Sequence, residues 1–165
     1  MEEKVRLIVG YGNPGKRYVN LSSNIAFLVL EAATKKIPSS WLMRARYMLF
    51  LVNTKPPTIL VKPRTFENRF DDTAYGLYLF YKTAPEDFYV VYPDENVSFG
   101  QYEITKESGV LPEAIAKIEK KIETRDFWKI KIGILGASAE FEETEHAVIK
   151  YLGEKLAKEL AISLF

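Results

Sequence analysis

The stretch Arg6-Leu-Ile-Val-Gly-Tyr-Gly-Asn-Pro-Gly-Lys16 decides the fold of this chain. An apolar run over 5–10 ends at a glycine, as a buried strand does. Asn-Pro-Gly at 13–15 is strong turn chemistry. A helix is then predicted from Ser22 or Ser23, both preferred N-cap residue types, to Pro38, which ends it. The order strand, tight turn, helix is typical of an α/β domain.

Strands and helices alternate along the rest of the sequence. Apolar runs and turn residues predict strands at 47–53 and 58–62, joined as a hairpin around Lys55-Pro-Pro, and at 88–92, 100–105 and 127–135. A loop is predicted at 93–98. Helices are predicted at 71–82, from Pro112 onward, and in a last segment whose apolar face carries Val148, Leu152, Leu156 and Leu160. This order predicts a three-layer α/β sandwich with a mixed, mostly parallel sheet wrapped by helices, in one domain over residues 1–165.

Composition favours a soluble globular protein, with 47% hydrophobic and 27% charged residues. The absence of cysteine excludes disulfides and thiol chemistry and fits a reducing compartment, either cytoplasm or an organellar matrix. The N-terminus does not read as a signal peptide, and no apolar run reaches the roughly 18 residues of a membrane span. We therefore expect no membrane partner.

Charge is spread unevenly along the chain. Residues 1–64 hold 11 Lys/Arg and 3 Asp/Glu, a balance of +8, and the remaining residues hold 12 and 19, a balance of −7. A basic segment of this kind suits a polyanion such as RNA if folding gathers its charges on one face. If folding interleaves the two parts, the asymmetry has no such meaning.

The glycines at positions 10, 12 and 15 match a dinucleotide-binding pattern. Three features argue against that interpretation. Pro14 removes one amide from the loop, and the predicted helix starts several residues after the last glycine. The acidic residue expected at the end of a second strand is also missing, because Glu31 lies inside the predicted helix. We expect no nucleotide cofactor; a plain tight turn explains the same residues.

The segment from Leu7 to Lys16, followed by Tyr18, Asn24 and Phe27, resembles the start of bacterial-type peptidyl-tRNA hydrolases. Three later blocks resemble the same family in the same order: Val-Lys-Pro-Arg-Thr-Phe-Glu-Asn at 61–68, Phe-Tyr-Lys-Thr-Ala-Pro-Glu-Asp-Phe-Tyr-Val-Val at 80–91, and Phe-Trp-Lys-Ile-Lys-Ile-Gly-Ile at 127–134. The resemblance implies the fold of that family. It also implies its reaction, cleavage of the ester between a peptide and the 3′ ribose of tRNA.

The family mechanism implies a histidine general base steadied by an aspartate, with asparagines that position the substrate. Asn13, Asn24 and Asn68 stand at asparagine positions of the family, with Phe66 beside the last one and Tyr18 at a rim position. The resemblance therefore implies a peptide-accepting pocket lined by amides.

The catalytic positions depart from the family pattern. Ser23 stands at the histidine position, Pro93 at the aspartate position with Asp94 one place later, and Glu113 at a family asparagine position. A serine hydroxyl is too weakly basic to replace an imidazole, and Ser23 is also explained as a helix cap. The single histidine, His146, is expected to be a surface or capping residue of the last helix. We expect an inactive hydrolase-like protein that binds RNA, either tRNA or ribosomal, or a ribonucleoprotein or protein partner.

Two alternatives remain open at this point. One is an active peptidyl-tRNA hydrolase with a rewired site that uses Asp94, Asn68 and water. The other is a metal-dependent peptidase such as a hydrogenase-maturation endopeptidase, although its metal ligands are not evident here and we expect no metal. The C-terminal region is expected to be shorter than in the family. Residues 140–145 are expected to form a shortened lid or to leave the cleft open, and the apolar residues 161–165 to pack on the core or on a partner.

Overall fold

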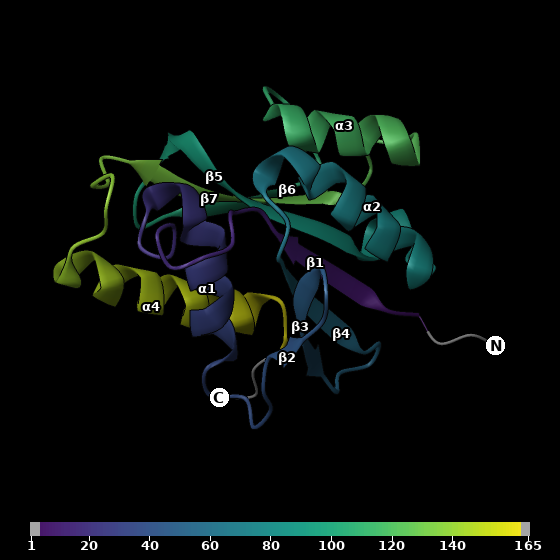
Figure 1. The fold of residues 1–165 in the computed structure, drawn as a ribbon, viewed down its shortest axis with the longest axis horizontal. Coiled ribbons are helices and arrows are strands. Elements are labelled where there is room, and N and C mark those ends of the chain that lie inside the picture. The colour runs from purple at the N-terminus through teal and green to yellow at the C-terminus, as the bar shows by residue number, and fades with distance from the viewer. Residues whose placement is uncertain (1–3, 163–165) are drawn as a thin grey trace.

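The computed structural model describes residues 4–162, and its centre is one mixed sheet (Figure 1). The seven strands lie in the order β2-β3-β4-β1-β5-β7-β6. The parallel strands are β1 (Arg6–Gly10), β4 (Thr58–Pro63), β5 (Phe88–Ser98) and β7 (Trp128–Leu135). The strands β2 (Leu42–Met43), β3 (Tyr47–Val52) and β6 (Tyr102–Thr105) run antiparallel to their neighbours. The predicted mixed, mostly parallel sheet is confirmed.

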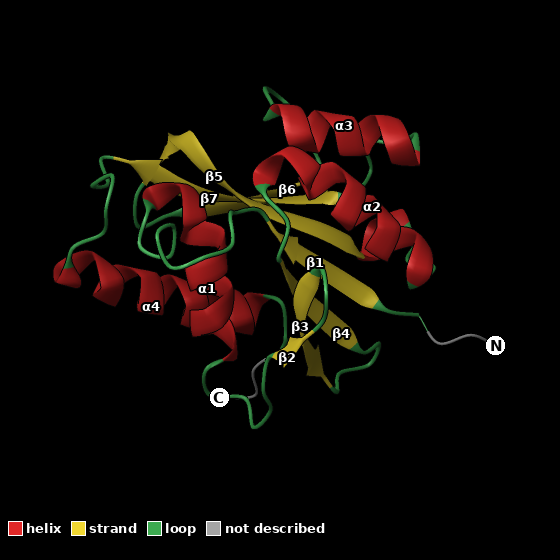
Figure 2. Ribbon diagram, in the orientation of Figure 1, coloured by secondary structure: helices red, strands yellow, loops and turns green. Residues whose placement is uncertain are grey.

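Helices cover both faces of the sheet (Figure 2). The helices α1 (Ile25–Thr34) and α4 (Glu143–Glu159) pack on one face, in a cluster with Ile8, Leu60 and Val91. The helices α2 (Phe70–Phe80) and α3 (Glu113–Ile122) pack on the other, in a cluster with Leu7, Val9 and Val61. Because successive residues of the central strands alternate between two buried faces, these strands read as uninterrupted apolar runs. Within residues 4–162, no helix is both long and apolar enough to cross a membrane.

Three short 3-10 turns complete the chain path. They are η1 (Ser22–Asn24), η2 (Glu67–Arg69) and η3 (Pro85–Asp87), which directly precede α1, α2 and β5. The carboxyl ends of β1 and β4 are neighbours in the sheet, so η2 and the loop after β1 come to the same edge. Ligands of open α/β sheets bind at such an edge.

Two element predictions are wrong. The helix predicted from Ser22 or Ser23 to Pro38 is shorter, because the serines lie in η1 and α1 ends at Thr34. Its N-cap is Asn24, and no side chain caps either η1 or α1, so Ser23 is not a helix cap. The loop predicted at 93–98 is instead the second half of β5, which pairs with β7 as far as Ser98.

The segment between β7 and α4 is tied to the loop after β1. Glu140 forms an isolated antiparallel bridge with Leu21, and α4 begins at Glu143. The predicted apolar end at 161–165 lies partly outside the described residues, and Ile162, which is described, is buried in the core.

Candidate functional site

The loop after β1 is held in place by the side chain of Asn24. Asn24 Oδ1 accepts a hydrogen bond from the backbone N–H of Asn13 at 2.9 Å, and its Nδ2 donates to the Asn13 carbonyl at 2.8 Å. Asn24 is only 1% exposed. Both polar atoms of this buried amide therefore serve the backbone of Asn13, and the Asn13 amide is not presented to a phosphate.

Gly12 permits this close packing. A Cβ at Gly12 would lie 3.0 Å from Asn24 Oδ1 and 3.1 Å from the ring of Phe27. At Gly15 the backbone has φ +105°, a conformation that glycine adopts without strain. These two glycines are thus explained by the turn and its packing on Asn24.

The side chain of Asn13 joins this loop to η2. Its Oδ1 accepts the backbone N–H of Glu67 at 2.8 Å. The Glu67 carboxylate in turn accepts the hydroxyl of Tyr11 at 3.1 Å, and burial together with that carboxylate raises the pKa of Tyr11 to about 12. Asn68 is exposed, and its side chain makes no hydrogen bond with any residue in 4–162, so its amide is available to a ligand.

A pocket of about 230 Å³ adjoins Asn13. We call it the amide cleft; its lining includes Asn13, Asn24, Phe27, Glu31, Lys62 and Arg64. The lysine is paired with Glu31 at 2.6 Å, and the arginine donates to the carbonyl of Arg44 at 2.5 Å. The cleft therefore combines amide, apolar and cationic groups.

Tyr18 and Phe66 meet beside this site. Their ring centroids are 6.0 Å apart, edge to face, and Phe66 is 53% exposed. The guanidinium of Arg17 lies over the Tyr18 ring at 5.3 Å. The structure thus brings together two predicted aromatic residues and a cation, while their part in binding stays a prediction.

Ser23 is hydrogen-bonded to no base in the described part of the chain. Its side chain is exposed, and its hydroxyl makes no hydrogen bond with residues 4–162. Strand alternation places Pro93 on the α1 side of β5, because Val91 packs with α1 and α4 whereas Val90 and Tyr92 pack with α2 and α3. Proline offers no side-chain oxygen there.

Asp94 projects to the opposite face of the sheet from Pro93. Tyr92 packs with α2 and α3, and its pKa is raised mainly by burial and next by the charge of Asp94. Its Oδ1 accepts the backbone N–H of Asn96 at 2.8 Å. The sheet therefore stands between the Asp94 carboxylate and the α1 side, where Ser23 lies.

Glu113 does not lie with the other predicted site residues. It is exposed in the first turn of α3 and pairs with Lys117 at 3.3 Å. The other end of α3 is the one that meets the start of α2, where Lys121 lies 2.9 Å from Asp71. With a rise of about 1.5 Å per residue, Glu113 stands roughly 12 Å along the helix from Lys121.

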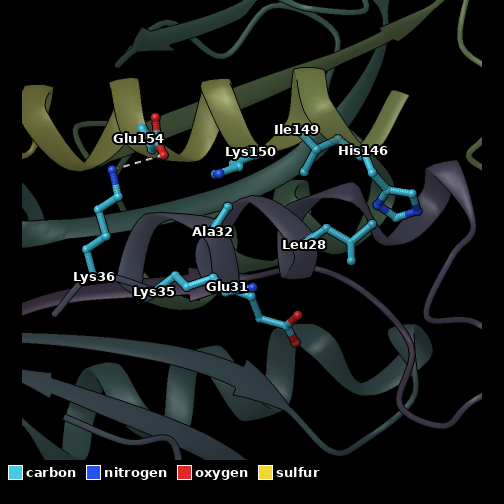
Figure 3. A pocket seen from close by; sticks show the side chains of 9 residues that line it. All are labelled: Leu28, Glu31, Ala32, Lys35, Lys36, His146, Ile149, Lys150 and Glu154. Carbon is cyan, nitrogen blue, oxygen red and sulfur yellow. Dashed lines mark ion pairs between the residues drawn. The ribbon is translucent and has the colours of Figure 1, made fainter. Parts of the chain in front are cut away.

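His146 lies on α4 at one end of a groove between α1 and α4 (Figure 3). The predicted surface position is confirmed, because the side chain is exposed. Its Nε2 is hydrogen-bonded to Asn20 Oδ1, and its ring meets that of Phe141 at 6.1 Å. Sequence reasoning missed this approach to the loop after β1, because 126 positions separate the two partners and no local pattern signals the contact.

Within the described part of the chain, no three or more His, Cys, Asp or Glu side chains lie close enough together to hold a metal ion. A hydrogenase maturation protease from Thermococcus kodakarensis nevertheless has a similar fold, with 17% identity, a TM-score of 0.55 and coverage of 96% of this chain and 90% of that one. At this identity the likeness concerns the fold alone.

Stronger similarity points to one family. The family model described as peptidyl-tRNA hydrolase matches residues 7–163. A peptidyl-tRNA hydrolase of Mesomycoplasma hyopneumoniae is 34% identical over 131 residues, which cover 79% of this chain and 70% of the relative. The crystal structure of peptidyl-tRNA hydrolase from Acinetobacter baumannii superposes with a TM-score of 0.77 at 19% identity, over 98% of this chain and 94% of that one. This chain belongs to the peptidyl-tRNA hydrolase family.

Proposed function

We propose that this protein binds peptidyl-tRNA through the amide cleft and hydrolyses its ester slowly or not at all. The observation that carries the proposal is the contrast between an intact Asn13 frame and an exposed Ser23 that is hydrogen-bonded to no base in residues 4–162. The Asn13 frame supports binding of the substrate. Ser23 argues against catalysis, because its hydroxyl does not accept a proton from the attacking water.

The weak hydrolysis follows from acid–base chemistry. A positioned general base contributes about 10²–10⁴-fold to the rate of such a reaction, and a serine hydroxyl does not accept a proton from water at neutral pH. Asp94 is on the other face of the sheet and is bonded to Asn96. Two carboxylates lie near Asn13: one oxygen of Glu67 accepts the Tyr11 hydroxyl, and Glu31, which lines the cleft, is paired with Lys62.

Binding is supported by the groups around the cleft. Asn68 offers a free amide for the peptide backbone, and the exposed ring of Phe66 and the half-buried ring of Tyr18 are suited to stack with a base. Lys16 and Arg17 are exposed in the loop after β1 and attract phosphate. The relatives that carry the name peptidyl-tRNA hydrolase support the choice of tRNA as the partner.

A single-turnover assay with excess protein over N-acetyl-aminoacyl-tRNA tests the proposal. We expect binding, measured by fluorescence anisotropy, with cleavage equal to that in buffer or only slightly faster. Asn68→Ala is expected to weaken binding. Cleavage by the wild-type protein that is accelerated by about 10²-fold or more, as by a general base, and that Asn13→Ala abolishes would overturn the proposal. If such activity then disappears in Asp94→Asn or in Glu67→Gln, the rewired carboxylate is identified.

A gain-of-function variant tests the same reasoning from the other side. Ser23→His combined with Pro93→Asp restores an imidazole and a carboxylate on one face of the sheet. We expect cleavage to rise by up to about 10²–10⁴-fold. The matched control, Ser23→Ala with Pro93→Asp, carries the carboxylate without the base and is expected to stay inactive.

A further inference from the structure

A second pocket lies outside the amide cleft, between α2 and the start of β3. Its volume is about 320 Å³, and its lining includes Arg46, Tyr47, Arg69, Asp72, Gly76 and Phe80. We call it the arginine pocket. Positions 73, 76 and 80 line it and form one stripe along α2, because they are spaced by three and four, and Arg69, the N-cap of α2, continues the stripe. The pocket is therefore a built feature of that helix and not a gap between loops.

The pocket carries two arginines that no carboxylate pairs with directly. Neither Arg46 nor Arg69 makes an ion pair or a side-chain hydrogen bond with any residue in 4–162. The one acidic residue in the lining is Asp72; Lys121 pairs with it and is the main cause of its lowered pKa, to which the more distant charge of Arg69 adds. Lys121 comes from α3 and is not part of the lining. Two guanidiniums are left to bind an anion, and their planar forks suit phosphate.

Aromatic rings complete the pocket. Tyr47 lies at the start of β3, and Phe80 ends α2 with 72% of its surface exposed. A large apolar ring left open next to unpaired guanidiniums matches the two parts of a nucleotide, a flat base and a phosphate. A purely ionic ligand would leave the rings unused, and a purely apolar ligand would bury the two cations without a partner.

We propose that the arginine pocket binds one nucleotide of a single-stranded RNA segment. Arg46 and Arg69 hold its phosphate, and its base lies against Phe80 and Tyr47. The choice of RNA over another phosphorylated ligand rests on the proposed function. Residues 64–69 connect the two sites, because Arg64 lines the amide cleft and Arg69 lines the arginine pocket. A single RNA strand that lies across residues 64–69 therefore reaches both the amide cleft and the arginine pocket.

Gly76 offers a way to fill the pocket without damaging the fold. A Cβ at this position would meet no atom within 4 Å, and glycine inside a helix costs about 0.5–1 kcal/mol relative to alanine. Gly76→Leu is therefore expected to leave the melting temperature unchanged or higher while its side chain occupies the space of the base. Gly76→Ala, which adds one methyl group, is the matched variant.

The probe is a 5′-fluorescein penta-adenylate, titrated with protein and followed by fluorescence anisotropy. We expect Gly76→Leu and Phe80→Ala each to weaken binding by roughly fivefold to a hundredfold, the range of one stacked base. The double variant Arg46→Gln/Arg69→Gln is expected to weaken binding and to reduce the slope of log affinity against log salt by about 0.7, as for one phosphate contact to a single strand. Gly76→Ala is expected to bind more tightly than Gly76→Leu.

The control double variant removes the same charge from the other face of the sheet. Lys35→Gln/Lys150→Gln changes two lysines that line the groove between α1 and α4 (Figure 3). It is expected to bind within about twofold of wild type, as for surface charges that contact no phosphate. Equal weakening by both double variants, with Gly76→Leu unaffected, would overturn the proposal in favour of diffuse charge attraction.

Two further results separate this inference from the proposed function. A phosphotyrosine peptide that binds more tightly than the oligonucleotide, with the same sensitivity to Gly76→Leu, would overturn RNA as the ligand. If the oligonucleotide binds the arginine pocket while N-acetyl-aminoacyl-tRNA shows no effect of Asn68→Ala, the amide-cleft function fails and the nucleotide pocket stands.

Discussion

Replacing Asn24 with alanine tests whether the buried amide holds the loop after β1. The change removes a 2.9 Å bond from the Asn13 N–H and a 2.8 Å bond to the Asn13 carbonyl. An orphaned buried polar group costs about 1–3 kcal/mol, and Asn13 is half-buried, so water reaches it in part. Taking the lower part of that range for each group gives a loss of about 2–4 kcal/mol.

The loss can be measured as a shift in melting temperature. At this chain length one kcal/mol corresponds to about 2–4 °C, so a loss near 3 kcal/mol predicts a decrease of roughly 6–12 °C. Asn68→Ala is the matched control, because this exposed amide makes no bond within residues 4–162, and we expect a change within about 0.5 kcal/mol. Equal melting temperatures for the two variants would refute the argument.

Asn24→Asp adds a test with a defined sign. Ionised, the new carboxylate would face the Asn13 carbonyl in a site that is 1% exposed, so its pKa is raised. A group with a raised pKa in the folded state stabilises the protein below its unfolded pKa of about 3.9 and loses that effect as the pH rises through the folded value. We expect Asn24→Asp to melt above Asn24→Ala at acidic pH and to lose this advantage towards pH 7.

Three further changes probe other parts of the molecule. Glu67→Gln removes the charge beside Tyr11 and is expected to lower the Tyr11 pKa from about 12 towards 10; carbon-13 tyrosine NMR measures it, and an unchanged titration would contradict the contact. With the pKa of Tyr11 raised, its contribution to stability is complete below pH 10 and is lost as the pH rises through about 12. Glu119→Gln leaves the buried ammonium of Lys129 without its partner at 3.1 Å, and we expect a loss of about 3–5 kcal/mol in urea unfolding. An unchanged midpoint would mean that the backbone carbonyls bonded to this ammonium suffice. Gly153→Ala would place a Cβ 2.4 Å from an alanine Cβ on α1, so we expect a loss of about 1–3 kcal/mol by calorimetry, and a stability equal to wild type would show that the helices separate freely.

The parallel core could be predicted from the sequence because its strands are buried on both faces. Each is then an apolar run bounded by glycine, proline or polar residues, and local pattern suffices. The second half of β5 shows the opposite case. Pro93, Asp94 and Asn96 are turn formers, yet the segment pairs with β7 through a shift in register between Asp94 and Ser98.

Gly133 explains why the pairing of β5 survives this irregularity. A Cβ at Gly133 would lie 2.1 Å from the Ser98 carbonyl oxygen and 2.6 Å from that of Val97. Glycine in β7 therefore permits an approach that another residue would block. The cause lies on a different strand, so no window around residues 93–98 contains it.

The candidate site could likewise be predicted only in part. Resemblance located Asn13, Asn24 and Asn68, but it could not separate their roles. The structure binds both polar atoms of Asn24 to the backbone of Asn13 and leaves Asn68 exposed. The two residues differ because Asn24 is buried and Asn68 is not. Whether a polar residue after a turn is buried is decided by long-range packing. For the same reason no local pattern indicates that Lys129, a polar position within a strand, is fully buried.

The frame around Asn13 contains only neutral groups. Two amide side chains and the backbone of Asn13 and Glu67 form it, and none of these changes charge in the physiological range. The charge of this frame therefore does not change with pH in the physiological range, while salt screens the charged side chains around the cleft. The proposed binding of an anionic ligand is therefore expected to weaken as ionic strength rises, while the Asn13 frame keeps its hydrogen bonds.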